Sequence, residues 1–463
     1  MKKISSYIII VLLFSLFSCK KYLDKTPDIK LAIPSSLSDF QSLLDVDVIT
    51  DGSTPGLLDL GSDDYYYDYA TYQSKAAVVQ NCYIWASDIW QGQVSNDWNG
   101  IYKNIFTANV VLEGLNSFKV SNASDEATKN YIYGHALFVR ATQHYYLEET
   151  FGQPCKPASS AADLGVPLKL TSSSADVTKR ATVQKVYDQI IKDLMQAKDL
   201  LPNATAAKSR PSKASAFAML ARIYLTMQDY SNAKKYADST LLLNSNLFDF
   251  NTLTAAQISS ANPLSQFLPP KDTAFESLYY THQSSFGVLR LTTTNIDTIL
   301  FNLFDNNDLR KAVFFQKNTA TNTWYFKGNY SGTSVRQFSG PAVDEIYLIR
   351  AECNARAGNK DAAMNDLNTL LIKRWKTGFF VPLVAIDADD ALRKVLIERR
   401  KELIYRGIRW IDLRRLNQDS RFSITLKRIL NGQTYMLPPN DIKYTYPIPD
   451  NEIQLSGIQQ NPR

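Results

Sequence analysis

Cysteine and histidine are scarce in this sequence, and their scarcity narrows the kinds of protein that it can encode. Only four cysteines and three histidines occur among 463 residues. After Cys19 the cysteines are Cys82, Cys155 and Cys353, an odd number with no CxxC motif, which argues against a zinc site and against a disulfide-dense scaffold. At most one disulfide can form. We expect it between Cys82 and Cys155, with Cys353 as a small apolar side chain buried on a helix.

Sequence motifs of the common enzyme classes are also missing. The chain has no HExxH zinc motif, no GxSxG nucleophile motif, no P-loop and no GxGxxG dinucleotide fingerprint. The remaining catalytic option is a glycoside hydrolase with two carboxylates, for which Asp63 with Asp64 or Glu148 with Glu149 are candidates. Adjacent carboxylates do not establish the separation across a bond that this chemistry requires. The sequence therefore favours a binding protein, with no catalytic residue, cofactor or metal ligand nominated.

The excess of basic over acidic side chains is small. Lysine and arginine outnumber aspartate and glutamate by 51 to 45, a formal net charge of +6 that does not call for nucleic acid as a partner. The most basic stretch runs from Leu392 to about Leu416, and it carries Glu398, Glu402 and Asp412 among its arginines. Because these acids recur at helical spacings, we expect partly buried ion pairs rather than a phosphate-binding surface.

The chain begins with a pattern typical of a bacterial lipoprotein signal. Two lysines precede an apolar run from Ile8 to Phe17, and Cys19 follows after one serine. The run is too short for an ordinary transmembrane helix and has the arrangement of a secretory signal. We therefore expect residues 1–18 to be a lipoprotein signal peptide and Cys19 to be the lipidation site, for example with palmitate. A plain signal peptide with a chance cysteine is the alternative.

Apolar residues recur at helical spacing through much of the remaining chain. Helix start and stop signals support the pattern, such as Thr182 as an N-cap and Gly152 with Pro154 beyond a helix end. We predict helices over residues 98–113, 126–151, 182–201, 213–225, 231–243 and 392–416. The sequence thus predicts a mostly α-helical protein in which residues 19–463 form a single domain.

A short repeat indicates how some of these helices pack. Ala221 and Ala233 lie twelve residues apart across a short turn, and Ala351 and Ala363 repeat that spacing. The pattern is typical of tetratricopeptide hairpins, where small residues let two antiparallel helices approach closely. We therefore expect tetratricopeptide-like helix pairs interrupted by irregular insertions.

Two insertions, near residues 61–97 and 245–340, are rich in aromatic side chains and contain strand-like fragments such as residues 323–326. A sugar ring offers C–H faces and hydroxyls, so its site needs flat aromatic rings beside hydrogen-bonding groups. Any single ring could instead pack the insertion onto the helices, and Trp98, which begins a helix, is assigned to the scaffold. The residues nominated for ligand binding are Asp64, Tyr66, Tyr69, Tyr72, Trp85, Trp90, Trp324, Tyr325 and Arg336.

Several stretches, taken in order, resemble the RagB/SusD family over nearly the whole chain after Cys19. They lie at 98–102, 134–141 with 151–152, 180–202, 214–237, 344–358, 397–403 with 409–413, and 447–453 with 460–462. The resemblance implies a SusD-like scaffold of four tetratricopeptide-like helix pairs. It also implies a nutrient-uptake lipoprotein on the outer membrane of a Bacteroidota-type bacterium, facing the cell exterior, with a SusC-like TonB-dependent transporter barrel as its partner.

The resemblance leaves the ligand open, because most matching motifs belong to the scaffold. The density of tyrosine and tryptophan favours an oligosaccharide over a peptide as the captured ligand. A surface scaffold that binds a protein without any role in import is a further alternative, and a barrel gene next to this one would argue against it.

Overall fold

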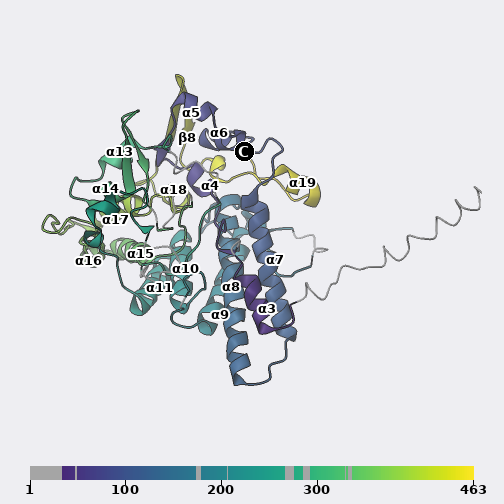
Figure 1. Ribbon diagram of the computed structural model, residues 1–463. Helices are drawn as coiled ribbons and strands as arrows, with labels where there is room; N and C mark the ends of the chain where they lie inside the picture. Colours follow the sequence, from purple (N-terminus) through teal and green to yellow (C-terminus); the bar gives the residue numbers. More distant parts are fainter. Residues whose placement is uncertain are drawn as a thin grey trace, which may run out of the picture.

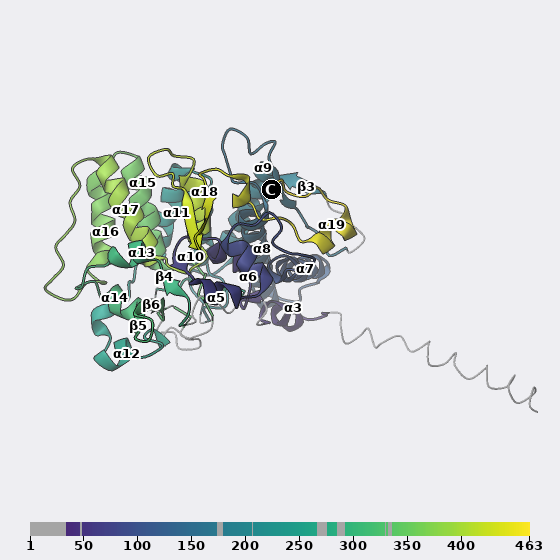
Figure 2. The same ribbon diagram turned by 90° about the horizontal axis from the view of Figure 1, so that it is seen from above.

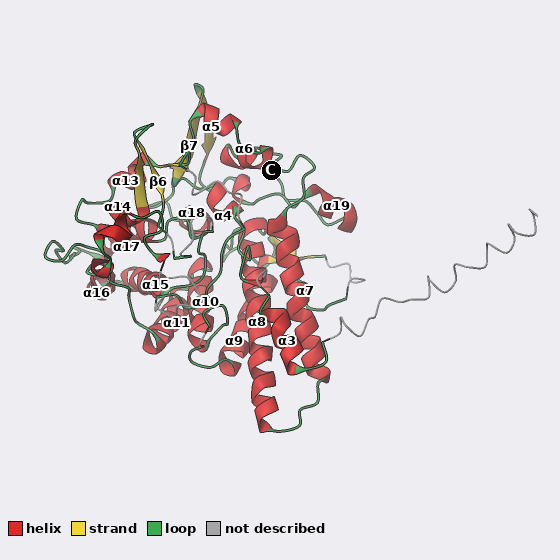
Figure 3. Cartoon of the chain, viewed as in Figure 1, coloured by secondary structure: helices red, strands yellow, loops and turns green. Residues whose placement is uncertain are grey.

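The computed structural model describes residues 34–46, 49–173, 179–205, 207–265, 276–284, 292–328, 330–331 and 336–463. Over these residues the chain is mainly helical, and its strands form two-stranded pairs (Figure 3). Two groups of helices lie side by side, and short helices and hairpins gather at one end of them (Figure 1). The predicted fold class, mostly α with tetratricopeptide-like pairs, is confirmed. The predicted signal peptide and Cys19 lie outside the described residues.

The first helical group is built around the long helix α8 (Ala123–Phe151). Helices α7 (Asn96–Ser117) and α9 (Val183–Leu200) pack along it, and the short helix α3 (Leu37–Leu44) packs against α7 and α8 (Figure 1). Thr182 caps α9, as predicted, because its hydroxyl accepts the N–H of the third helical residue. Helices α7, α8 and α9 begin and end within a few residues of the bounds predicted for them, 98–113, 126–151 and 182–201.

The two predicted hairpins form the second group and pack against each other through their middle helices. The four alanines of the repeat, Ala221, Ala233, Ala351 and Ala363, are fully buried, which confirms the close approach of the paired helices. Gly358 makes the turn within the second hairpin with φ of +85°, a conformation that favours glycine. The helices of this group are α10 (Lys213–Thr226), α11 (Tyr230–Leu243), α15 (Val343–Arg356), α16 (Lys360–Leu371) and α17 (Ala388–Glu402).

Short elements surround the helical groups, and the strand predicted at residues 323–326 is present. The antiparallel pairs are β1 (Tyr65–Tyr66) with β4 (Asn295–Ile296), β2 (Leu164–Pro167) with β3 (Arg180–Thr182), β5 (Phe315–Asn318) with β6 (Thr323–Phe326), and β7 (Leu426–Leu430) with β8 (Gln433–Leu437). The short helices are α4 (Leu57–Leu60), α5 (Tyr69–Gln73), α6 (Ala77–Tyr83), α12 (Ala255–Ser259), α13 (Thr298–Asn302), α14 (Leu309–Phe314), α18 (Arg409–Leu416) and α19 (Asp450–Ser456), with 3-10 turns at Phe250–Thr252 and Ile442–Tyr444.

The prediction of one continuous basic helix toward the C-terminus is wrong. Helix α17 ends at Glu402 and α18 begins at Arg409. Between them Tyr405 and Gly407 have φ of +54° and +69°, which no α-helix accommodates. The N–H of Gly407 donates to the carboxylate of Asp59 at 3.2 Å. The break is therefore stabilised by a segment far away in sequence, which local hydrophobic spacing does not reveal.

The basic stretch forms buried ion pairs, as predicted, but several of its partners lie on other elements. Glu402 of α17 accepts from Arg374, in the turn after α16, at 2.7 Å and from Arg310 of α14 at 2.8 Å. The same two arginines hold Glu276 at 2.5 Å and Asp308 at 2.6 Å, and none of these five side chains has exposed surface. Burial opposes ionisation of Glu402, yet Arg374 and Arg310 outweigh it and lower the pKa of that carboxyl.

The three cysteines within the described residues are all free and buried. The expected disulfide between Cys82 and Cys155 is therefore wrong, whereas Cys353 lies buried within α15, as predicted. Among the helices of the described ranges, none combines the length and the apolar character that crossing a bilayer requires.

We expect Arg374→Met to lower the free energy of unfolding by about 3–5 kcal/mol, because it removes a partner from two fully buried carboxylates. Urea unfolding followed by circular dichroism measures this loss. Arg421→Met is the matched control, because Arg421 is 41% exposed in its pairs with Asp389 and Asp419 and exposed pairs contribute about 0–1 kcal/mol. Equal losses in the two variants would contradict a special role for the buried network.

Candidate ligand-binding site

Three of the nominated tyrosines lie together around α5 on a surface that we call the α5 patch (Tyr66, Tyr69 and Tyr72). Asp68 caps this short helix by accepting the N–H of Thr71 at 2.8 Å. Tyr69 is 41% exposed, and Tyr66 and Tyr72 are half-buried. The rings of Tyr69 and Tyr72 lie 6.4 Å apart with their planes at 21°. The patch therefore presents partly exposed, nearly parallel rings, which suit stacking of a ligand.

Buried rings beneath the α5 patch hold it in place. The ring of Tyr72 lies 5.8 Å from that of Tyr83, which lies 5.0 Å from Tyr67 and 5.6 Å from Tyr65. The hydroxyl of Tyr83 accepts the N–H of Tyr67 at 3.0 Å. Tyr65, Tyr67 and Tyr83 are all buried, so the aromatic run of this segment divides into a core layer and a surface layer.

The second group lies on the hairpin of β5 and β6 and beside it, and we call it the β6 patch (Phe301, Trp324 and Tyr325). Trp324 stacks on Phe301 of α13 with ring centroids 4.5 Å apart, and the Nζ of Lys311 lies 5.1 Å from the Phe301 ring. Tyr325 points to the opposite face of the strand from Trp324, and both are half-buried. Phe301 was not nominated from the sequence, because no local pattern shows that α13 meets this hairpin.

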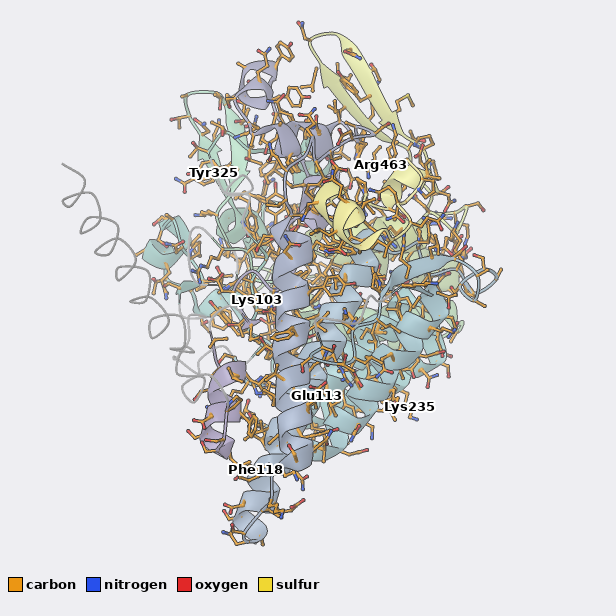
Figure 4. The ribbon with its side chains drawn as sticks, turned by 90° about the vertical axis from the view of Figure 1, so that its right-hand side faces the viewer. Lys103, Glu113, Phe118, Lys235, Tyr325 and Arg463 are labelled. Atoms are coloured by element: carbon orange, nitrogen blue, oxygen red, sulfur yellow. The ribbon has the colours of Figure 1, made fainter. Side chains whose placement is uncertain are left out.

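The two patches gather at the same end of the molecule. Strand β1, next to the α5 patch, pairs with β4 through Tyr65 with Ile296 and Tyr66 with Asn295, and β4 in turn packs against β6. Figure 2, seen from above, shows α5, β4 and β6 as neighbours. Figure 4 shows Tyr325 on its hairpin at the end where the β7–β8 hairpin also projects. The two insertions predicted from the sequence are therefore joined in space.

The nominations of Trp85 and Trp90 are corrected by the structure. Each side chain is 1% exposed. The indole N–H of Trp85 donates to the carbonyl of Gly61 at 3.0 Å, and that of Trp90 donates to the carbonyl of Pro447 at 2.8 Å. Indoles buried in this way present no face to a ligand. They belong to the core, as does Trp98, which is 2% exposed and was assigned to the scaffold.

Asp64 and Arg336 have partners within the protein. The Asp64 side chain is 1% exposed, and its carboxylate accepts from Arg400 at 3.0 Å. Its nomination as a ligand-binding residue is therefore corrected, because the carboxylate is buried in an ion pair. Arg336 forms an ion pair with Asp51 at 2.7 Å. The structure thus places Trp324 and Tyr325 on opposite faces of β6 and pairs Arg336 with a different segment.

The acidic pair Asp63 and Asp64 does not have the setting of a catalytic dyad. Arg409 donates to both oxygens of Asp63, at 2.7 and 2.8 Å, and Arg400 lies 3.1 Å from the same carboxylate. Burial alone would raise the pKa of Asp63, but Arg409 and Arg400 outweigh it and lower the pKa. A carboxylate that remains ionised between two guanidinium groups is poorly suited to donate a proton to a leaving group.

Glu148 and Glu149 face the core instead of a surface. Glu148 accepts the N–H of Val166 at 2.9 Å, and burial raises its pKa to about 8. Glu149 accepts from the hydroxyl of Tyr187, and both glutamates are at most 2% exposed. No polysaccharide can reach these carboxyls in this structure. In the part of the chain that the structure describes, no cluster of three or more His, Cys, Asp or Glu side chains is placed to hold a metal ion.

Comparison with known protein families agrees with this architecture. Residues 21–225 match a family described as starch-binding and associating with the outer membrane, and residues 343–463 match the SusD family. The two matches cover the first helical group and, of the second group, most of α10 and the helices α15, α16 and α17. The chain is a member of the SusD/RagB family, and its resemblance to that family is confirmed.

Individual relatives have low sequence identity to this chain, and the solved structures among them share its fold. The chain is 25% identical over 378 residues to the SusD-like protein P2 of Formosa agariphila, a match that spans 70% of this chain and 72% of the relative. A SusD superfamily structure from Bacteroides thetaiotaomicron has a TM-score of 0.74 at 21% identity, covering 92% of this chain and all of the other. A laminarin-binding SusD-like protein has a TM-score of 0.67 at 17% identity, covering 93% and 100%.

The raised pKa of the buried Glu148 predicts that the stability of the protein depends on pH. Its pKa is raised from 4.5 to about 8 in the folded state, so between these values the folded protein keeps a proton that the unfolded chain loses. Its contribution to stability is fully present below pH 4.5 and is lost as the pH rises toward 8. We expect wild type to lose stability relative to Glu148→Gln across this window, by about 1.4 kcal/mol per pH unit at most.

Chemical denaturation at several pH values measures the difference between wild type and Glu148→Gln. Glu126→Gln, on the exposed first turn of α8, is the control and should track wild type. A wild-type and Glu148→Gln difference that stays constant from pH 5 to 8 would show that Glu148 is ionised in the folded protein.

Proposed function

We propose that this protein captures oligosaccharides at the cell surface and passes them to a SusC-like TonB-dependent transporter in the outer membrane. The observation that carries the proposal is the pair of aromatic patches, whose rings are partly exposed at one end of the molecule. Membership of the SusD/RagB family supports a role in nutrient binding. The fold that it shares with a laminarin-binding protein makes glucans the first ligand class to test.

The chemistry of the patches suits a neutral sugar chain. Aromatic rings stack on the C–H faces of sugars, and tyrosine hydroxyls both donate and accept hydrogen bonds at the edges. The α5 patch contributes three tyrosines, and the β6 patch contributes a stacked Trp324–Phe301 pair on one face of β6 and Tyr325 on the other. Two patches at one end give a chain of sugar residues several points of contact. Peptides carry apolar and polar groups too, so they remain the second ligand class.

The anchor and the partner belong to the same proposal. A lipid on Cys19 would hold the protein on the outer membrane, with the folded domain facing the exterior, where large glycans arrive. A binding protein of this kind leaves its ligand chemically unchanged. The arginine-bound Asp63 and the buried Glu148 favour this role over a glycoside hydrolase.

We expect Tyr72→Ala and Trp324→Ala each to weaken binding of a laminarin- or starch-derived oligosaccharide several-fold, because a stacking ring contributes about 0.5–1.5 kcal/mol beyond its buried area. Isothermal titration calorimetry measures the affinity, and thermal unfolding tests that the fold is intact. Phe379→Ala, which removes an exposed ring in the loop after α16, is the matched control and should bind like wild type.

A core tryptophan supplies the opposite control. Trp90→Ala should lower the free energy of unfolding by about 3–5 kcal/mol, because it leaves a large cavity and an unpaired carbonyl. If the two patch variants lose stability and keep their affinity, the patches are structural and the binding site lies elsewhere. Cleavage of the oligosaccharide during prolonged incubation, seen by mass spectrometry, would instead favour the hydrolase.

We expect Cys19→Ala to release the protein from bacterial membranes without unfolding it, because the substitution removes the site of lipid attachment. Metabolic labelling with a fatty-acid analogue followed by membrane fractionation measures both effects. Cys353→Ala retains Cys19 and should remain labelled. A wild-type protein that takes up no label would contradict the lipoprotein proposal.

A further inference from the structure

The β7–β8 hairpin projects beside α5 at the end of the molecule that carries both aromatic patches (Figures 1 and 3). Its turn is Asn431-Gly432, with φ of +47° and +80°, the backbone that a tight two-residue hairpin turn requires. Arg428 on β7 is the cross-strand partner of Tyr435 on β8. Because side chains alternate along a strand, these two share one face, while Met436 lies on the other.

Arg428 attaches the inner face of the hairpin to the core beneath the α5 patch. Its guanidinium carbon lies 4.2 Å from the ring centroid of Tyr83, 5.1 Å from Tyr65 and 5.5 Å from Trp85. The same guanidinium donates to the backbone carbonyls of Tyr65 and Ser62. Arg428 is 6% exposed, so the hairpin is held at a fixed place against this aromatic layer.

The same aromatic layer joins the hairpin to the α5 patch. Tyr83, which contacts Arg428, also contacts Tyr72 of the patch at 5.8 Å between ring centroids. Tyr435 is half-buried, whereas Met436, its neighbour on the opposite face, is 59% exposed. Burial raises the pKa of Tyr72, and the Tyr435 phenol raises it further.

We propose that Tyr435 is a further ligand-stacking ring of the α5 patch, and that Arg428 is the residue that positions it. The inference rests on the proposed function, and it extends the α5 patch from one insertion onto the C-terminal hairpin. A sugar chain that stacks on Tyr69 and Tyr72 then lies with one side against the hairpin. The hairpin thereby limits the direction in which the chain can extend across the patch.

The test compares two neighbouring residues on opposite faces of β8, with laminarin- and starch-derived oligosaccharides as probes. Tyr435→Ala should weaken binding several-fold, and Tyr435→Phe should stay within about twofold of wild type because the ring is retained. Met436→Ala should bind like wild type. Thermal unfolding of all three variants should match wild type, because none of these side chains is fully buried.

The outcomes separate this inference from the proposed function. If Tyr72→Ala weakens binding and Tyr435→Ala does not, the hairpin takes no part in binding and the inference is overturned, while the proposed function stands. If the wild-type protein binds neither glucan nor any other oligosaccharide of an array, the proposed function fails and takes the inference with it.

A double-mutant cycle tests the role of Arg428. Arg428→Met should weaken binding by about as much as Tyr435→Ala. The double variant should bind about as tightly as either single variant, because both changes remove the same ring contact. Arg428→Met should lower the unfolding temperature in either case, because Arg428 is buried and donates to two backbone carbonyls. The double-mutant cycle therefore decides, because an arginine that acts independently of Tyr435 would give additive losses of affinity. Additive losses would overturn the positioning role.

Discussion

Buried pairs between arginines and carboxylates are the interaction on which the rest of this structure depends. Glu402 of α17 accepts from Arg310 and Arg374, and these arginines reach Asp308 and Glu276 on segments far apart in the sequence. Such pairs add little net stability compared with apolar packing. The loss of one partner, however, leaves an unpaired charge buried in the core, which destabilises the fold. They therefore tie the insertion at 245–340 to the second helical group at a defined place.

The same arrangement reaches the candidate site. Arg400 of α17 and Arg409 of α18 hold Asp63 and Asp64, which lie directly before β1 and the α5 patch. A short aromatic segment without regular periodicity is thereby fixed to rigid helices at its base, and its outer rings are left at the surface. The α5 patch, the β6 patch and the β7–β8 hairpin are thus irregular pieces positioned by a helical scaffold, an arrangement that many binding proteins use.

Much of the scaffold could be predicted from local patterns, and much of the site could not. The alanine spacing predicted the close helix pairs, and Thr182 predicted the start of α9, because both signals act within one hairpin or one turn. Trp85 and Trp90 were misassigned because their burial depends on contacts with segments far away in the sequence. The carbonyl that Trp90 pairs with belongs to Pro447, near the C-terminus, and no local pattern tells a buried indole from an exposed one.

Tyr435 was overlooked although part of its signal is present. Asn431-Gly432 is a strong signal for a hairpin turn, but nothing in it shows that the hairpin lies against α5. The break between α17 and α18 was likewise hidden, because Asp59 supplies the contact that stabilises Gly407. Tertiary contacts of this kind decide which aromatic side chains remain available to a ligand.

The central claim is that an oligosaccharide binds across the aromatic patches at one end of the molecule. Hydrogen exchange with and without a saturating laminarin- or starch-derived oligosaccharide tests it most directly, because backbone amides report on every segment at once. The account predicts slower exchange at residues 65–73, 323–326 and 426–437, with the helices of the first group unchanged. Protection confined to α7, α8 and α9 would contradict it.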